Sequence, residues 1–232
     1  MKLLVLSDLH GNLSIIDRLP RKIMNKIDIL VICGDLTHYG NLSDATQILK
    51  TLSTLDIPVL FVPGNCDPKA LGAPPVIHGA ENIHGRVKVV KGLDFIGIGG
   101  SPLGPFHTPF EMSEIEITEI LNKAYEDSQP FTQFVLVSHS PPLNTKVDLT
   151  ASGIHAGSKA VREFVETQKP SLVLCGHIHE ARGETILNET VLVNPGPAHL
   201  DLYAIVDITE GITVNLGRVM VKKVKSESVN ES

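Results

Sequence analysis

Residues 3–12, LLVLSDLHGN, give the first indication of the fold, because an apolar run leads directly into a serine, an aspartate and a histidine. A short, unbroken apolar run is typical of a strand that is buried on both faces of a sheet. In open α/β sheets, ligands bind just beyond the carboxyl ends of such strands. We therefore expect Asp8 and His10 to lie at a functional edge of a sheet.

The same pattern recurs further along the chain, where an apolar run is again followed by glycine or serine and then by a polar residue. The further runs are DILVICGDL (28–36), PVLFVPGNCD (58–67), FVLVSHSPP (134–142) and LVLCGHIHE (172–180). We predict that all five strand ends meet on one rim and bring their polar residues together. The predicted ligands are Asp8, His10, Asp35, Asn65, His139, His177 and His179.

This set of side chains predicts a metal centre. Carboxylate oxygens, imidazole nitrogens and an amide carbonyl, with no obligatory thiolate, suit borderline divalent metals. One zinc-like ion takes three or four protein ligands, so a set of this size implies two ions that share a carboxylate. Asp35 is the candidate bridge. Taken singly, Asp8 also fits a helix cap and Asp35 a turn, because aspartate is favoured at both.

Five sequence motifs, in this order, resemble those of the calcineurin-like metallophosphoesterases. They are D-x-H at 8–10, G-D at 34–35, G-N-x-D at 64–67, a lone histidine at 139 and G-H-x-H at 176–179. The resemblance runs from residue 3 to about residue 180. It implies that one metal is held by Asp8, His10, Asp35 and His179, and the other by Asp35, Asn65, His139 and His177.

The order of expected elements predicts an α/β fold. Strands ending near Ser7, Gly34 and Pro63 alternate with expected helices over 14–25 and 43–54, which indicates a parallel sheet. Further helices are expected over 113–127 and 158–168. The late strand-like segments are expected to be antiparallel and to form a second sheet; they are 184–187, 190–194, 202–207 and 212–221. Two mixed sheets flanked by helices make a four-layer α/β/β/α sandwich, which the family resemblance also implies.

Length and composition limit the classes of protein. We expect a single domain over residues 1–221 and a polar, frayed tail over 222–232. The formal net charge of −6 lacks the basic footprint of a nonspecific nucleic-acid binder. Asp8 interrupts the apolar start of the chain before a signal peptide or membrane span is complete, and three cysteines fit free thiols in a reducing compartment. We expect a cytoplasmic protein without a membrane partner; a homodimer remains open.

The expected activity is hydrolysis of a phosphoester, and a small or nucleotide phosphodiester is favoured. Two divalent ions would acidify a bridging water, and the resulting hydroxide would attack phosphorus in line. Manganese is favoured, although iron, nickel and zinc accept the same ligands. The catalytic candidates are Asn65, Asp67, His139 and His155, and the candidates for substrate binding are Asn12, Phe106 and His107. The irregular segment 101–112, which also contains Phe110, is expected to cap the cleft.

Cys66 is the main departure from the family pattern. Many members of the family that this chain resembles have G-N-H-D or G-N-H-E, in which the histidine protonates the leaving group. The G-N-C-D variant is similar to that of a small prokaryotic branch with phosphodiesterase activity, so a diester is favoured over a monoester. His155 or His38 is a candidate substitute for the missing histidine. The alternatives are a phosphomonoesterase, a nuclease acting on ends, or a scaffold protein with the same fold.

Overall fold

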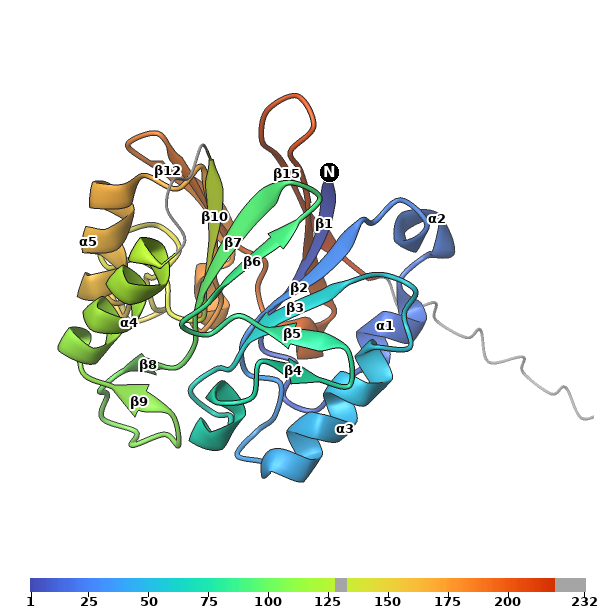
Figure 1. Ribbon diagram of the computed structural model, residues 1–232, viewed down its shortest axis with the longest axis horizontal. Coiled ribbons are helices and arrows are strands. Elements are labelled where there is room, and N and C mark those ends of the chain that lie inside the picture. Colours follow the sequence, from blue (N-terminus) through green and yellow to red (C-terminus); the bar gives the residue numbers. More distant parts are fainter. Residues whose placement is uncertain (128–132, 220–232) are drawn as a thin grey trace, which may run out of the picture.

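The computed structural model describes residues 1–127 and 133–219, and Figure 1 shows two sheets side by side with helices on their outer faces. The first sheet has the strand order β15 (Thr213–Arg218), β14 (Leu202–Asp207), β1 (Lys2–Leu6), β2 (Ile29–Cys33), β3 (Val59–Val62), β5 (Ala80–Asn82) and β4 (Val76–Ile77). Strands β1, β2, β3 and β5 are parallel, whereas β14 pairs antiparallel with β1. The first sheet is therefore mixed.

The second sheet is mixed as well. Its strand order is β12 (Gly183–Leu187), β13 (Thr190–Asn194), β11 (Leu172–Leu174), β10 (Phe134–Ser138), β7 (Leu93–Ile98) and β6 (Val87–Val90). The four central strands are parallel, and β12 and β6 pair antiparallel with their neighbours. A short parallel pair, β8 (Ser101–Pro102) and β9 (Glu111–Met112), lies beside these sheets at the base of a long loop.

The helices form the two outer layers. On the first sheet lie α1 (Ser14–Arg18), α2 (Arg21–Met24) and α3 (Leu42–Leu52), and on the second lie α4 (Glu114–Glu126) and α5 (Lys159–Gln168) (Figure 1). Single-turn 3₁₀ helices occur at Lys69–Gly72, His179–Ala181 and Ala198–Leu200. Ser113 and Glu116 form a capping box at the start of α4, which satisfies backbone donors that the helix itself leaves unpaired.

The apolar residues divide into three cores, one for each boundary between layers. Leu4 and Leu49 belong to the core between the first sheet and its helices, and Leu136 to the core beneath α4 and α5. Val5 and Val137 belong to the core between the sheets. Successive residues of a strand point to opposite faces, so a continuous apolar run serves two cores at once. The structure thus confirms the four-layer sandwich with two mixed sheets.

Two expectations about individual elements are wrong. The late strands do not form a sheet of their own, because β13 pairs parallel with β11 in the second sheet while β14 joins β1 in the first. The expected helix over 14–25 is split into α1 and α2 around Pro20, whose ring and missing N–H are incompatible with the interior of a helix. The end of the expected strand 212–221 and the tail 222–232 lie outside the described residues.

The loops that leave the parallel strands are tied together by their backbones. The Asp8 N–H donates to the Gly34 carbonyl at 3.0 Å, and the Gly176 N–H donates to the His139 carbonyl, also at 3.0 Å. Asp8, His10, Asp35 and His177 have φ values between 46° and 67°, in the left-handed region that side chains other than glycine rarely adopt. Such conformations persist only where the surroundings hold them, and they concentrate at functional sites.

Glycine beside the ligands permits a close approach of neighbouring loops. A Cβ at Gly64 would lie 2.0 Å from Asp35 Oδ1 and 2.1 Å from the Asp35 backbone nitrogen. A Cβ at Gly34 would lie 2.3 Å from Nδ1 of His139. Real side chains do not approach so closely, so these positions must lack a Cβ for Asp35 and His139 to stay where they are.

We expect Gly64→Ala to lower the free energy of unfolding by about 1–3 kcal/mol, because the added methyl group forces the buried Asp35 loop to shift. Urea denaturation of metal-free protein measures this change. Gly183→Ala is the matched control, since the nearest atom to its Cβ is 3.9 Å away and no loss of stability is expected there. Equal stability of the two variants would show that the loop gives way freely.

Candidate metal centre

The structure brings the predicted ligands together at the carboxyl ends of β1, β2, β3, β10 and β11. The ligand atoms of Asp8, His10 and His179 all lie within 4.8 Å of one another. Within this first group, His10 Nε2 is 3.4 Å from His179 Nε2, and His179 Nε2 is 3.4 Å from Asp8 Oδ1. Three side chains from the two sheets therefore face a common point.

A second group lies beside the first. The ligand atoms of Asp8, Asp35 and His139 also lie within 4.8 Å of one another, and His139 Nε2 is 2.8 Å from Asn65 Oδ1. The ring of His177 is 5.0 Å from that of His139, measured between centroids. All seven predicted ligands thus fall into two adjoining clusters.

Asp35 lies between these clusters. Its Oδ1 is 3.5 Å from Nε2 of His139, and its Oδ2 is 3.8 Å from Nε2 of His10. Asp8 is placed differently, because its Oδ2 accepts the backbone N–H of His177 at 3.2 Å while Oδ1 faces His179. The two oxygens of Asp35 therefore face different clusters.

Two of the ligand histidines, His10 and His177, present neutral nitrogens to the centre, whereas interaction with Asp8 raises the pKa of His179. Nδ1 of His139 is 2.7 Å from the Cys33 carbonyl, and Nδ1 of His10 is 3.3 Å from the Thr37 carbonyl, so each Nδ1 donates to a backbone oxygen and each Nε2 faces the centre. Burial lowers the pKa of His10 to about 4 and that of His177 to about 3. Neutral imidazole is the form that binds metals.

Among the described residues, the carboxylates of Asp8 and Asp35 form ion pairs only with histidines. Although burial acts to raise it, interaction with His179 lowers the pKa of Asp8 to about 2. Burial raises the pKa of Asp35 to about 7, and the nearby Asp8 and Asp67 act in the same direction. Asp8 Oδ1 is a buried oxygen without a hydrogen-bond donor among the described residues. An unpaired buried carboxylate oxygen is costly, and a divalent cation would satisfy it. The donor set and the unpaired Asp8 oxygen both fit bound metal ions.

Asp67 lies behind the centre. Its carboxylate accepts hydrogen bonds from the backbone N–H groups of Leu36, Thr37 and Gly64, at 3.0, 2.7 and 2.8 Å, and from the Thr37 hydroxyl at 2.8 Å. These bonds fasten the loop that carries Asp35 to the loop that carries Asn65. The arrangement favours a positioning role for Asp67 over the catalytic role expected from the sequence.

Two other sequence candidates have different partners. Nδ1 of His155 is 2.7 Å from Asp148 Oδ1, and no hydrogen bond or ring contact among the described residues joins His155 to the predicted ligands. Asn12 accepts the backbone N–H of Ser14 at 3.0 Å and donates to the His199 carbonyl at 3.4 Å. Its amide therefore supports the turn that follows His10.

The loop between β8 and β9 contains both exposed and buried aromatic residues. Phe106 is 83% exposed and His107 is exposed, whereas Phe110 is buried and its ring lies 5.2 Å from that of His84. Phe110 therefore packs into the protein at the base of the loop, and Phe106 and His107 are the exposed aromatic residues of this loop. The Phe110 N–H donates to the Asn65 carbonyl at 3.0 Å, so the base of this loop is attached to a predicted ligand.

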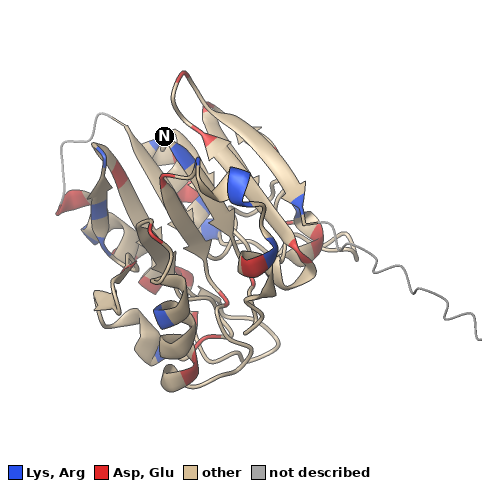
Figure 2. Ribbon diagram, turned by 90° about the vertical axis from the view of Figure 1, so that its right-hand side faces the viewer, with Lys and Arg blue, Asp and Glu red and all other residues tan. Residues whose placement is uncertain are grey.

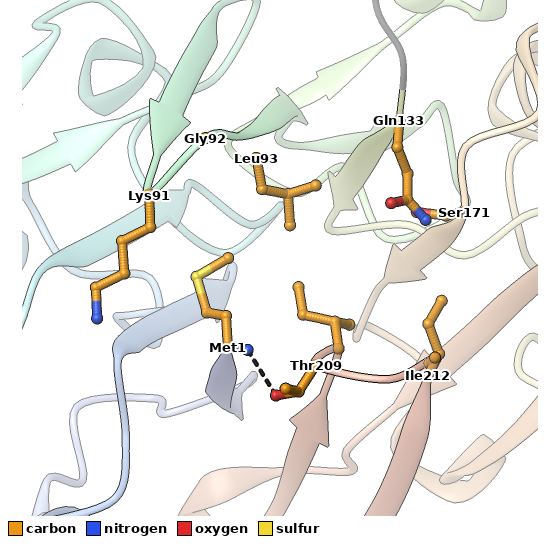
Figure 3. Close-up of a pocket in the computed structure, with 10 residues that line it drawn as sticks. Met1, Lys91, Gly92, Leu93, Gln133, Ser171, Thr209 and Ile212 are labelled. Carbon is orange, nitrogen blue, oxygen red and sulfur yellow. Dashed lines mark hydrogen bonds between the residues drawn. The ribbon is translucent and has the colours of Figure 1, made fainter.

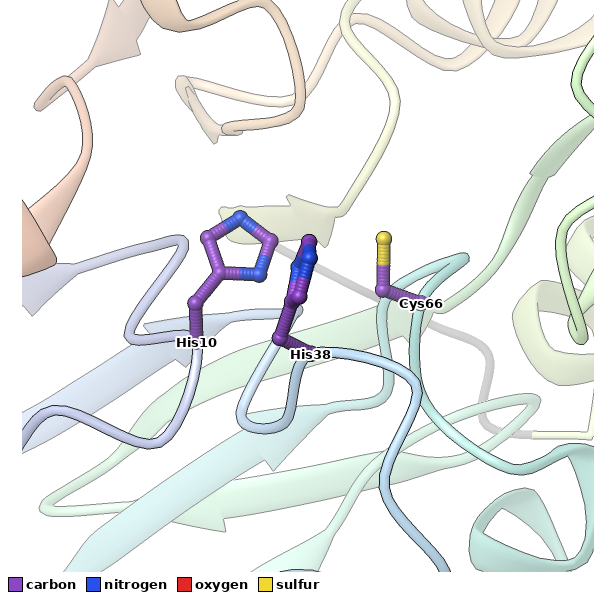
Figure 4. A group of neighbouring side chains, drawn as sticks. All are labelled: His10, His38 and Cys66. Atoms are coloured by element: carbon purple, nitrogen blue, oxygen red, sulfur yellow. The ribbon is translucent and has the colours of Figure 1, made fainter.

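The rim also contains histidines outside the predicted ligand set. The ring of His38 lies 5.1 Å from that of His10, measured between centroids. A ring nitrogen of His38, one of His10 and the Cys66 sulfur all lie within 4.8 Å of one another (Figure 4). The sequence patterns do not identify His199. Its ring lies 5.1 Å from that of His10, measured between centroids, and its Nδ1 donates to the Asp8 carbonyl at 2.9 Å. A strand at 190–194 parallel to β11 would have placed His199 on this rim, but that strand was expected to be antiparallel.

A cavity of about 480 Å³ lies at the starting ends of the strands, on the side of the sheets opposite the predicted ligands (Figure 3). Its lining includes Met1, Leu93 and Ser171, which come immediately before or at the start of β1, β7 and β11. The ligands follow the ends of strands, whereas these residues stand at their beginnings. This cavity therefore does not belong to the candidate centre.

Figure 2 shows segments with Lys or Arg interspersed among segments with Asp or Glu, and no continuous basic band is visible on this side of the described residues. This distribution agrees with the acidic net charge of −6. In residues 1–127 and 133–219, no helix is long and apolar enough to cross a membrane.

Comparison with known sequences gives a family and two relatives. The family model described as calcineurin-like phosphoesterase matches residues 1–181. An uncharacterized protein of Methanocaldococcus jannaschii is 38% identical over 207 residues, which cover 88% of this chain and 91% of the relative. A probable cyclic nucleotide phosphodiesterase of Vesicomyosocius okutanii is 27% identical over 178 residues, which cover 74% of this chain and 71% of the relative.

A solved structure supports the same fold. A protein of Thermus thermophilus has a TM-score of 0.72 at 19% identity, and the match covers 94% of this chain and 99% of that protein. This likeness concerns the fold, while the family match covers most of the chain, including every predicted ligand. With the two ligand clusters at the strand ends, these findings show that the chain belongs to the calcineurin-like phosphoesterases, a family of metal-dependent phosphoester hydrolases.

Proposed function

We propose that this chain is a phosphodiesterase with two divalent metal ions, held on either side of Asp35. The observation that carries the proposal is the position of that carboxylate, with Oδ1 facing His139 and Oδ2 facing His10. A carboxylate that faces two ligand clusters is suited to bridge two ions.

The ligand assignment follows the position of Asp35 between His10 and His139, and Asp8 is common to both groups of close ligand atoms. One ion would be held by Asp8, His10, Asp35 and His179, and the other by Asp35, Asn65, His139 and His177. Manganese is the favoured metal, while iron, nickel and zinc suit the same donors. Metal availability, more than the ligand set, would select among them.

Bound ions would supply an activated water as nucleophile and would withdraw charge from the phosphoryl oxygens. The protein holds the ligands in place before substrate arrives, which spares the reaction the cost of ordering them. Asp67 clamps the loops of Asp35 and Asn65, and Asn65 contributes a neutral oxygen where a further carboxylate would repel an anionic substrate.

Two observations favour a diester over a monoester. The relative from Vesicomyosocius okutanii is named a probable cyclic nucleotide phosphodiesterase. Cys66 occupies the position of the motif histidine, and burial raises the pKa of its thiol, so this side chain remains neutral beside the centre. A monoester, which is more negatively charged, would gain less from a neutral neighbour. The scaffold alternative is disfavoured because all predicted ligands converge.

We expect added Mn²⁺ to raise the melting temperature of metal-stripped protein, because an ion that binds only the folded state stabilises it. Asp35→Asn should lose most of this rise, since it removes the charge between the clusters. Differential scanning calorimetry with and without the ion measures the effect. Asp17→Asn, on the exposed face of α1, is the control and should keep the full rise. An undiminished rise in Asp35→Asn would contradict the proposed bridge.

The reloaded enzyme should hydrolyse bis-p-nitrophenyl phosphate with a higher kcat/KM than p-nitrophenyl phosphate. Release of p-nitrophenolate measures both reactions under the same conditions. A preference for the monoester would favour the phosphatase alternative. Failure to hydrolyse either ester, despite bound metal, would favour a scaffold protein.

A further inference from the structure

Tyr39 has a conformation that packing does not account for. Its φ is 57°, in the region that is costly for an aromatic residue, yet 55% of its surface is exposed. The backbone holds it there, because the Tyr39 N–H donates to the Cys66 carbonyl at 3.2 Å. Such conformations concentrate at functional sites, and Tyr39 shares this one with the predicted ligands Asp8, His10 and Asp35.

The phenol lies on the Cys66 side of the centre. The ring of Tyr39 packs edge to face on that of His38, with 4.9 Å between centroids, and His38 in turn packs on His10. Cys66 lies in the same group as His10 and His38, with ligand atoms within 4.8 Å of one another (Figure 4). The Cys66 thiol raises the pKa of Tyr39, with further contributions from partial burial and from Asp35.

These neighbours differ in their access to a substrate. Cys66 is 7% exposed and its N–H and carbonyl are engaged with Asp35 and Tyr39, so the thiol is largely covered. The Tyr39 phenol is exposed and remains protonated at neutral pH. Its backbone N–H is hydrogen-bonded to the loop that carries Cys66. Departure of a strongly basic alkoxide or phenoxide from phosphorus is accelerated by a proton donor within hydrogen-bond reach of the leaving oxygen.

We propose that the Tyr39 hydroxyl donates a hydrogen bond to the leaving-group oxygen of the phosphodiester and transfers its proton there as the P–O bond breaks. The leaving oxygen keeps the electron pair of that bond and gains the proton, and the phenolate then takes a proton from water. His38 holds the phenol ring in place. This inference rests on the proposed phosphodiesterase activity.

Tyr39→Phe tests the inference, because it removes the hydroxyl and keeps the ring. We expect kcat on diphenyl phosphate, which has a poor leaving group, to fall by about 10²-fold. The kcat on bis-p-nitrophenyl phosphate should stay near the wild-type value, since p-nitrophenolate leaves without assistance. Tyr125→Phe, in α4 on the outer face of the second sheet, is the matched control and should slow neither substrate.

The rise in melting temperature with Mn²⁺ reports whether the metal site is intact. This rise should be the same in Tyr39→Phe as in the wild type if Tyr39 donates a proton and has no structural role. Equal slowing of both diesters, or no slowing of diphenyl phosphate, would overturn the inference while the proposed activity stands. A wild-type enzyme inactive on both diesters would overturn the proposed activity and the inference with it.

Discussion

The structure depends on burying carboxylates and imidazoles together at the rim where two sheets meet. Asp8 and Asp35 are almost fully buried, and one oxygen of Asp8 has no hydrogen-bond donor among the described residues. Burial of such charge is unfavourable unless a cation compensates it. The protein therefore holds its predicted ligands in an arrangement that a bound metal would complete, which connects the fold to the metal-dependent hydrolysis of the family.

Rigid surroundings make this arrangement possible. Parallel strands from both sheets end at the same rim, and backbone hydrogen bonds link the loops that follow them. Asp67 fastens two of these loops from behind, and Gly64 allows one to pass within contact of Asp35. The left-handed conformations of four predicted ligands show how strongly the surroundings determine the backbone there.

Local sequence patterns predict much of this architecture, for physical reasons. Apolar runs followed by polar residues identified the strand ends, because a strand buried on both faces must be apolar throughout. The sheet to which β13 and β14 belong depends on long-range pairing, which no local pattern encodes. The break between α1 and α2 was predictable from Pro20, because proline disrupts the interior of a helix. His199 reaches the rim only through tertiary folding, because the parallel pairing of β13 with β11 places it there, and spacing along the chain could not identify it.

The most direct test of the account is anomalous X-ray diffraction from crystals of the Mn²⁺-loaded protein. Two manganese peaks on either side of the Asp35 carboxylate, roughly 3.5–4 Å apart as in other two-metal sites, are the expected result. A single peak held by Asp8, His10 and His179, with Asp35 bound to no second ion, would contradict the central claim.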